Sequence, residues 1–103
     1  MKLTDARAKF NLLRTDKRRI LISSHVREDH PERGFTVNEV QDLISVGQGR
    51  LEDNNKMPTS QLGSFLFHCL DEDERRCEIG IRFEKTGPDE YILVIHAFRR
   101  IRQ

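Results

Sequence analysis

The chain has 103 residues, the length of one small domain, of which 36% are hydrophobic and 34% are charged. This composition is polar, but six phenylalanines and several runs of Ile, Leu and Val exclude an intrinsically disordered protein. The formal net charge of +1 provides no overall attraction to nucleic acid, although basic residues cluster at 17–19 and at 99–102.

The sequence predicts a cytoplasmic protein without a membrane partner. The longest uncharged apolar stretch, residues 91–98, is much shorter than a membrane span, and the first residues lack the apolar centre of a signal peptide. The two cysteines, Cys69 and Cys77, are too few for a disulfide framework and are not spaced as zinc ligands. We therefore expect both to be reduced, buried thiols.

The N-terminal half of the chain is predicted to be mainly helical. Thr4 precedes apolar residues at helical spacing, which predicts an amphipathic helix over residues 5–14. The β-branched run at 19–23 is typical of a strand, although a buried helical turn has the same pattern. Ser24 can cap a brief helix that reaches about residue 28, before Pro31.

The clearest local pattern is a capping box at the start of a second helix. Thr36 and Glu39 have the spacing at which the side chain of each residue accepts a hydrogen bond from the backbone N–H of the other. Gly47 follows the last apolar residue. The pattern predicts a helix over residues 37–46. A short strand over 49–52 is expected to follow it.

The C-terminal half changes to alternating apolar and polar residues, after a predicted loop at 53–60. Three strands are expected, over 65–69, 77–84 and 91–98, joined by short connections rich in turn residues. The predicted fold is therefore α+β, one domain over residues 1–103. Its N-terminal helices pack on one face of a mainly antiparallel sheet that ends in a three-stranded meander.

Strand pairing has to keep apolar residues on one face, which limits the register of each hairpin. We expect the hairpins to be centred on Asp73 and Gly87. The expected opposite residues are Phe65 with Ile81, Phe67 with Ile79 and Cys69 with Cys77 in the first hairpin, and Phe83 with Tyr91, Ile81 with Leu93 and Ile79 with Ile95 in the second.

The same register places Glu78 between His68 and His96 on the other face of the sheet, with Arg82 farther along it and Phe98 continuing it past His96. A carboxylate between two imidazoles can orient one ring and raise its basicity, which suits general acid–base chemistry. The alternative is an ordinary cross-strand polar pair of His68 and Glu78, with His96 filling space among apolar neighbours.

Two histidines and a carboxylate are also the ligands of mononuclear iron sites. Such sites hold the ion in a pocket, whereas neighbouring side chains on a flat sheet do not enclose it. We therefore expect no metal and no cofactor.

Residues 25–40 carry a family resemblance. His25, the pair Arg33 and Gly34, and the helix opening that follows resemble a bacterial domain-of-unknown-function family grouped with BrnT-type and RelE-like toxins. The resemblance extends over residues 20 to about 100. Pro31 departs from the family pattern, because it interrupts the helix between His25 and Arg33.

The resemblance implies a metal-independent ribonuclease of toxin–antitoxin type, in which a ribose 2′-hydroxyl attacks the adjacent phosphate. His96 would be the base or the acid. The full set of candidate catalytic residues is His96, Glu78, His68 and Arg82, and the candidate phosphate-binding residues are Arg99, Arg100, Arg33 and His25. The implied partners are RNA and a small antitoxin or immunity-type protein, with the chain a monomer or homodimer.

The second hypothesis is a non-catalytic module of the same fold that binds a protein or a nucleic acid. The near-zero net charge and the acidic residues 71–74 favour this hypothesis, because few phosphate contacts release few counterions. The terminal arginine cluster and the row of histidines favour the ribonuclease.

Overall fold

A computed structural model of the chain describes residues 2–24, 26, 36–54 and 63–99. It has the predicted α+β fold. The elements are α1 (Leu3–Leu13), a 3₁₀ helix η1 (Lys17–Arg19), β1 (Ile20–Ile22), α3 (Val37–Val46), β2 (Gly49–Asp53), β3 (Ser64–Leu70), β4 (Arg76–Thr86) and β5 (Asp89–Arg99).

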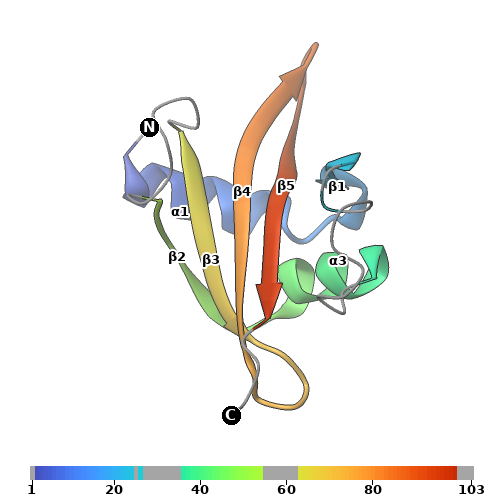
Figure 1. Cartoon of the computed structure of the whole chain (residues 1–103). Coiled ribbons are helices and arrows are strands. Elements are labelled where there is room, and N and C mark those ends of the chain that lie inside the picture. The colour runs from blue at the N-terminus through green and yellow to red at the C-terminus, as the bar shows by residue number, and fades with distance from the viewer. Residues whose placement is uncertain (1, 25, 27–35, 55–62, 100–103) are drawn as a thin grey trace.

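The five strands form one sheet in the order β1-β5-β4-β3-β2 (Figure 1). Strands β2 to β5 are antiparallel neighbours, which confirms the C-terminal meander. The strand predicted at 19–23 is confirmed as β1, and it pairs parallel to β5, with Ile20 opposite Ile92. The first strand of the chain is therefore held by the last.

Helices α1 and α3 cover the same face of the sheet and enclose the hydrophobic core (Figure 1). Phe10 of α1 lies against Phe67 of β3, with their ring centroids 4.9 Å apart, and both side chains are buried. Ile44 of α3 is fully buried in the same cluster. We call the opposite face, which no described helix covers, the open face.

The predicted start of α3 is confirmed, with the Thr36 half of the capping box in place. The backbone N–H of Glu39 donates to Oγ1 of Thr36 at 3.1 Å, and the N–H of Gly47 closes the helix on the carbonyl of Leu43. The predicted cap of α1 is wrong: this helix begins at Leu3, so Thr4 lies inside its first turn. Leu3 packs against the core, and the helix begins two residues earlier than predicted, at Leu3 instead of Asp5.

The register predicted for the first hairpin is confirmed, since Phe65 lies opposite Ile81 and Cys69 opposite Cys77. The register predicted for the second hairpin is wrong by one residue. Thr86 pairs with Asp89 across a two-residue turn whose Gly87 has φ 62°, and such short turns are the commonest way to close a hairpin.

The shifted register changes which residues of β5 face the core. Ile92 and Val94 are fully buried there, whereas Tyr91, Leu93 and Ile95, predicted to face the core, are only half-buried. Of the brief helix expected after Ser24, the structure describes Ser24 and Val26, and both are helical. The predicted cap is displaced by one residue, because the backbone N–H of Val26 donates to Oγ of Ser23 at 3.4 Å. The rest of that segment and most of the loop expected at 53–60 fall outside the described residues.

Candidate functional site

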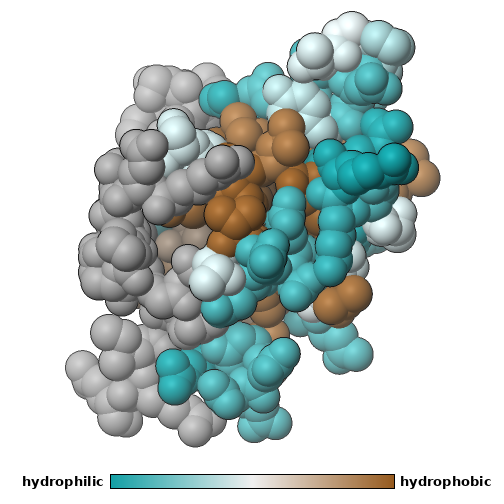
Figure 2. All heavy atoms as spheres, turned by 90° about the vertical axis from the view of Figure 1, so that its right-hand side faces the viewer, coloured by the Kyte–Doolittle hydropathy of each residue, from teal (hydrophilic) through white to brown (hydrophobic). Residues whose placement is uncertain are grey.

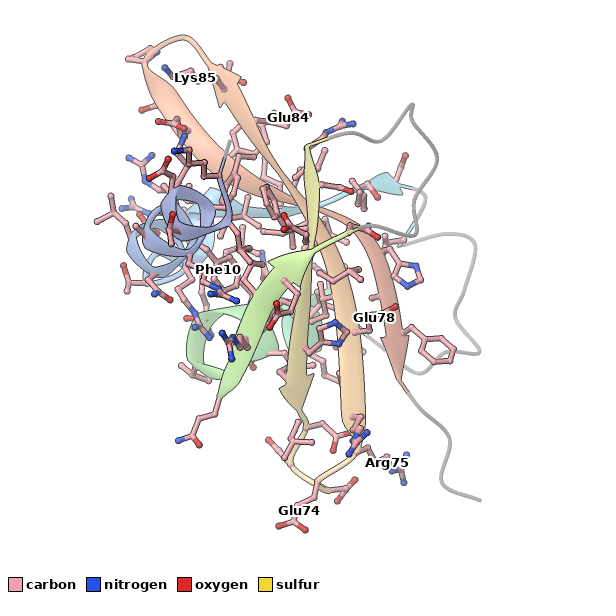
Figure 3. All side chains as sticks on the ribbon, turned by 90° about the vertical axis from the view of Figure 1, so that its left-hand side faces the viewer. Phe10, Glu74, Arg75, Glu78, Glu84 and Lys85 are labelled. Carbon is pink, nitrogen blue, oxygen red and sulfur yellow. The ribbon has the colours of Figure 1, made fainter. Side chains whose placement is uncertain are left out.

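Polar side chains cross the open face in a line. The register places Arg50 of β2, His68 of β3, Glu78 of β4 and Phe98 of β5 next to one another. Figure 3 shows Glu78 on this side of the sheet and Phe10 of α1 on the other. Directly opposite residues of antiparallel strands have Cβ atoms roughly 4.5–5.5 Å apart, so a cation, an imidazole, a carboxylate and an aromatic ring are neighbours.

The prediction that His68 lies opposite Glu78 is confirmed. His68 is exposed, and 37% of the Glu78 side chain remains accessible. Both groups are therefore within reach of a ligand that lies on the sheet.

His96 reaches the same carboxylate, but from a register that the sequence did not predict. It lies opposite Gly80 rather than Glu78, because Ile95 forms a β-bulge between the pairs Ile81 with Val94 and Gly80 with His96. The bulge returns His96 to the open face after the one-residue shift at the turn. The Nε2 atom of His96 then lies 3.5 Å from Oε2 of Glu78.

Gly80 provides the room for this contact. A Cβ atom built at Gly80 would lie 3.0 Å from the Cβ of His96, a tight distance for two carbon atoms. Because position 80 has no side chain, the imidazole can lie over β4 and approach Glu78, two residues along the strand. The structure therefore brings His68, Glu78 and His96 together.

Arg82 lies farther along the open face. It pairs with Ser64 on one side and Leu93 on the other, two residues from Gly80, which is roughly 7 Å along the strand. Its Nε lies 2.5 Å from Oε1 of Glu84 without the alignment of a hydrogen bond, so the two form an ion pair. Arg82 is near the His96 end of the site rather than part of the contact with Glu78.

A shallow basic hollow borders the site at the other end of these strands. Arg50 and Arg76 line it together with His68 and Leu70. The Arg50 side chain is 72% exposed and forms an ion pair with Glu52 at 3.1 Å. Two guanidinium groups beside an imidazole are suited to hold a phosphate.

Sequence reasoning missed Arg50 and Arg76. The position of Arg50 depends on how β2 pairs with β3, and residues 54–63, which connect these strands, are too many for a hairpin-turn sequence motif to predict their register. Arg76 could have been found, because the correctly predicted first hairpin places it opposite Leu70 on the same face as Glu78.

The two cysteines lie on the core side of the sheet. Cys69 and Cys77 are buried, lie directly opposite each other and are not joined by a disulfide, as expected from the sequence. Burial, aided by the neighbouring Cys77, raises the pKa of the Cys69 thiol to about 12. Cys69 is therefore a protonated core residue at neutral pH and a poor nucleophile.

The candidate phosphate-binding residues fall largely outside the described part of the chain. His25, Arg33 and Arg100 lie outside it. The backbone of Arg99 is the last residue of β5 and pairs with Cys77, and its side chain is not described.

No family model, curated protein or solved structure matches this chain significantly. Within the described ranges, no group of three or more His, Cys, Asp and Glu side chains is arranged to hold a metal ion. No helix in this part of the chain has both the length and the apolar character needed to cross a bilayer.

Proposed function

We propose that the open face binds RNA and cleaves it without a metal ion, through attack of a ribose 2′-hydroxyl on the adjacent phosphate. The observation that carries the proposal is the contact of His96 with Glu78 at 3.5 Å, beside a second imidazole on the opposite strand. The resemblance of residues 25–40 to the RelE-like toxins points to the same chemistry.

Each step of the proposed reaction can be assigned to a group of this site. Glu78 orients His96, whose other imidazole nitrogen accepts the proton of the 2′-hydroxyl as the 2′-oxygen attacks phosphorus. The bond from phosphorus to the 5′-oxygen breaks, and protonated His68 donates a proton to that leaving oxygen. The products are a 2′,3′-cyclic phosphate and a free 5′-hydroxyl.

Cations of the open face stabilise the charge that gathers on the phosphate. Arg50 and Arg76 bind the sugar-phosphate backbone of the RNA in the basic hollow. Arg82 lies at the end of the site that carries His96. Phe98, opposite Glu78 and 39% exposed, offers a ring on which a base can stack. A small protein that covers this face would inhibit the enzyme, in the manner of an antitoxin.

Incubation of the protein with a mixed RNA pool in EDTA tests the proposal. Wild type should yield products with cyclic phosphate ends, and His96→Ala should lower the cleavage rate by about a hundredfold or more, the usual contribution of a general base. Lys85→Ala, on the distant β4–β5 hairpin (Figure 3), is the matched control and should cleave at the wild-type rate. A DNA strand of the same sequence should stay intact, because it has no 2′-hydroxyl.

A second candidate, a module that binds RNA without cleaving it, is favoured by the shallow, half-exposed position of the acid–base pair, with 28% of the His96 side chain accessible. The same experiment separates the two candidates. Intact RNA, together with binding that weakens in salt and is lost in Arg50→Ala, would support the binding module and end the ribonuclease proposal.

A further inference from the structure

A groove on the other side of the molecule separates α3 from the hairpin that joins β3 to β4. One wall is the outward side of α3, with Glu39, Asp42 and Val46, and the other is residues 70–74 of the hairpin. Leu43 lies at its base and packs against the core. The groove is thus built on two ordered elements.

Apolar side chains reach the surface in this groove. Val46 is 76% exposed and Leu70 is 51% exposed, so each wall presents a large hydrophobic side chain to solvent. On the side of the molecule that carries β1 and α3, apolar groups stand among mainly hydrophilic side chains (Figure 2). Exposed apolar side chains within a groove, surrounded by charge, are typical of a surface that binds another protein.

The charge around the groove has one sign. Among the described residues that line it, every ionisable side chain is a carboxylate, two from α3 and four from the hairpin at 71–74. Lys17, which does not line the groove, forms an ion pair with Asp42. The potential in the groove is therefore negative, and a phosphate would be repelled.

Hydrogen bonds to Asp71 fix the backbone of the hairpin. Oδ1 of Asp71 accepts hydrogen bonds from the backbone N–H groups of Asp73 and Arg75, each at 2.9 Å. The N–H of Glu74 donates to the carbonyl of Asp71 at 3.0 Å, and Glu74 has a φ of 61°. This wall does not have to be ordered when a ligand binds.

We propose that the groove binds a basic, amphipathic segment of a partner protein. Its Leu or Ile side chains would pack on Val46 and Leu70, and its Lys or Arg side chains would face the carboxylates of both walls. Charge complementarity selects this occupant over an acidic peptide or a nucleic acid. Leu70 also lines the basic hollow, so the two surfaces meet at this residue, whereas Glu78 and His96 do not line the groove.

Selection of random peptides of roughly 12 residues, about 18 Å long if helical, on the full-length chain tests the proposal. Selected peptides should be enriched in Lys or Arg together with Leu or Ile. The affinity of the most enriched peptide, measured by fluorescence anisotropy, should fall about tenfold or more in Val46→Glu and in the double variant Glu72→Lys, Asp73→Lys. It should also fall as salt is raised.

Leu12→Glu is the matched control, because Leu12 is 75% exposed on α1 and does not line the groove. This variant should bind the peptide as wild type does. Enrichment of acidic peptides, or equal binding by Val46→Glu, would overturn the proposal. Sedimentation that shows a dimer broken by Val46→Glu would also overturn it, because a second copy of the chain would then fill the groove.

Discussion

Arg14 joins the two helices through a single side chain. Its Nε donates to the carbonyl of Ile44 at 2.6 Å and its Nη2 to the carbonyl of Gly47 at 2.5 Å, so it satisfies carbonyls at the C-terminal end of α3. Its guanidinium carbon also lies 4.9 Å from the ring centroids of Phe10 and of Phe67. Burial lowers the pKa of Arg14 from its ordinary value of 12.5, which leaves the group charged at neutral pH.

We expect Arg14→Met to destabilise the protein by roughly 1.5–3 kcal/mol, the usual range for hydrogen bonds made by a charged group. Arg14→Lys should restore only part of the loss, because an ammonium group does not reproduce the planar fork that reaches two carbonyls. Urea unfolding measures both effects. Arg18→Met is the control: this side chain is 91% exposed, and its replacement should change stability by less than about 0.5 kcal/mol.

At the scale of elements, the start of α3 can be predicted from the local sequence, whereas the start of α1 cannot. The α3 start follows the capping box, with Thr36 as N-cap, whereas α1 has Lys2 at the N-cap and no side-chain cap. A capping box is a local contact between neighbouring residues, so it can be read from the sequence. The two extra residues at the start of α1 depend on the packing of Leu3, which is not local.

These starts predict opposite results for two similar substitutions. Thr36→Ala should cost about 1 kcal/mol of stability, because it leaves the N–H of Glu39 without its acceptor. Thr4→Ala should leave stability unchanged or raise it slightly, since Ala is the better helix former inside a first turn. Thermal unfolding of both variants checks this. An equal loss in Thr4→Ala would contradict the start of α1 at Leu3.

The site shows the same division between local and nonlocal information. Period-two alternation and the short acidic turn sufficed to predict that His68 lies opposite Glu78. The contact between Glu78 and His96 was also expected, but through a register that the structure corrects. The turn shifts β5 by one residue, and the bulge at Ile95 adds a second one-residue shift. Together they return His96 to the open face, but opposite Gly80 instead of Glu78.

At the scale of the whole molecule, an ion pair connects the first helix of the chain with its last strand. Nζ of Lys9 in α1 donates to Oε2 of Glu90 in β5 at 2.5 Å. This hydrogen bond holds the pKa of Glu90 below its ordinary value. A carboxyl whose pKa is lower in the folded state stabilises the fold above its unfolded pKa, and this stabilisation is lost as pH falls through the folded value.

Glu90→Gln should therefore be less stable than wild type near neutral pH. The difference should shrink as pH falls through the lowered pKa of Glu90, because the carboxyl then becomes protonated in wild type as well. Urea unfolding midpoints measured in a series of buffers from neutral to acidic pH follow this loss. Lys9→Met combined with Glu90→Gln should cost less than the sum of the single variants, because both remove the same contact. A difference that is constant with pH would rule out this role of the pair.

The sequence alone determined the features that depend on near neighbours: α3 and its caps, the three long strands, the first hairpin and the α+β class. Tertiary structure decided the parallel pairing of β1 with β5, the position of Arg50 beside His68, and the bulge that returns His96 to the open face. The first two features pair strands that are separated by a long stretch of chain, and the bulge depends on how β4 and β5 pack far from their turn, so no local pattern encodes them.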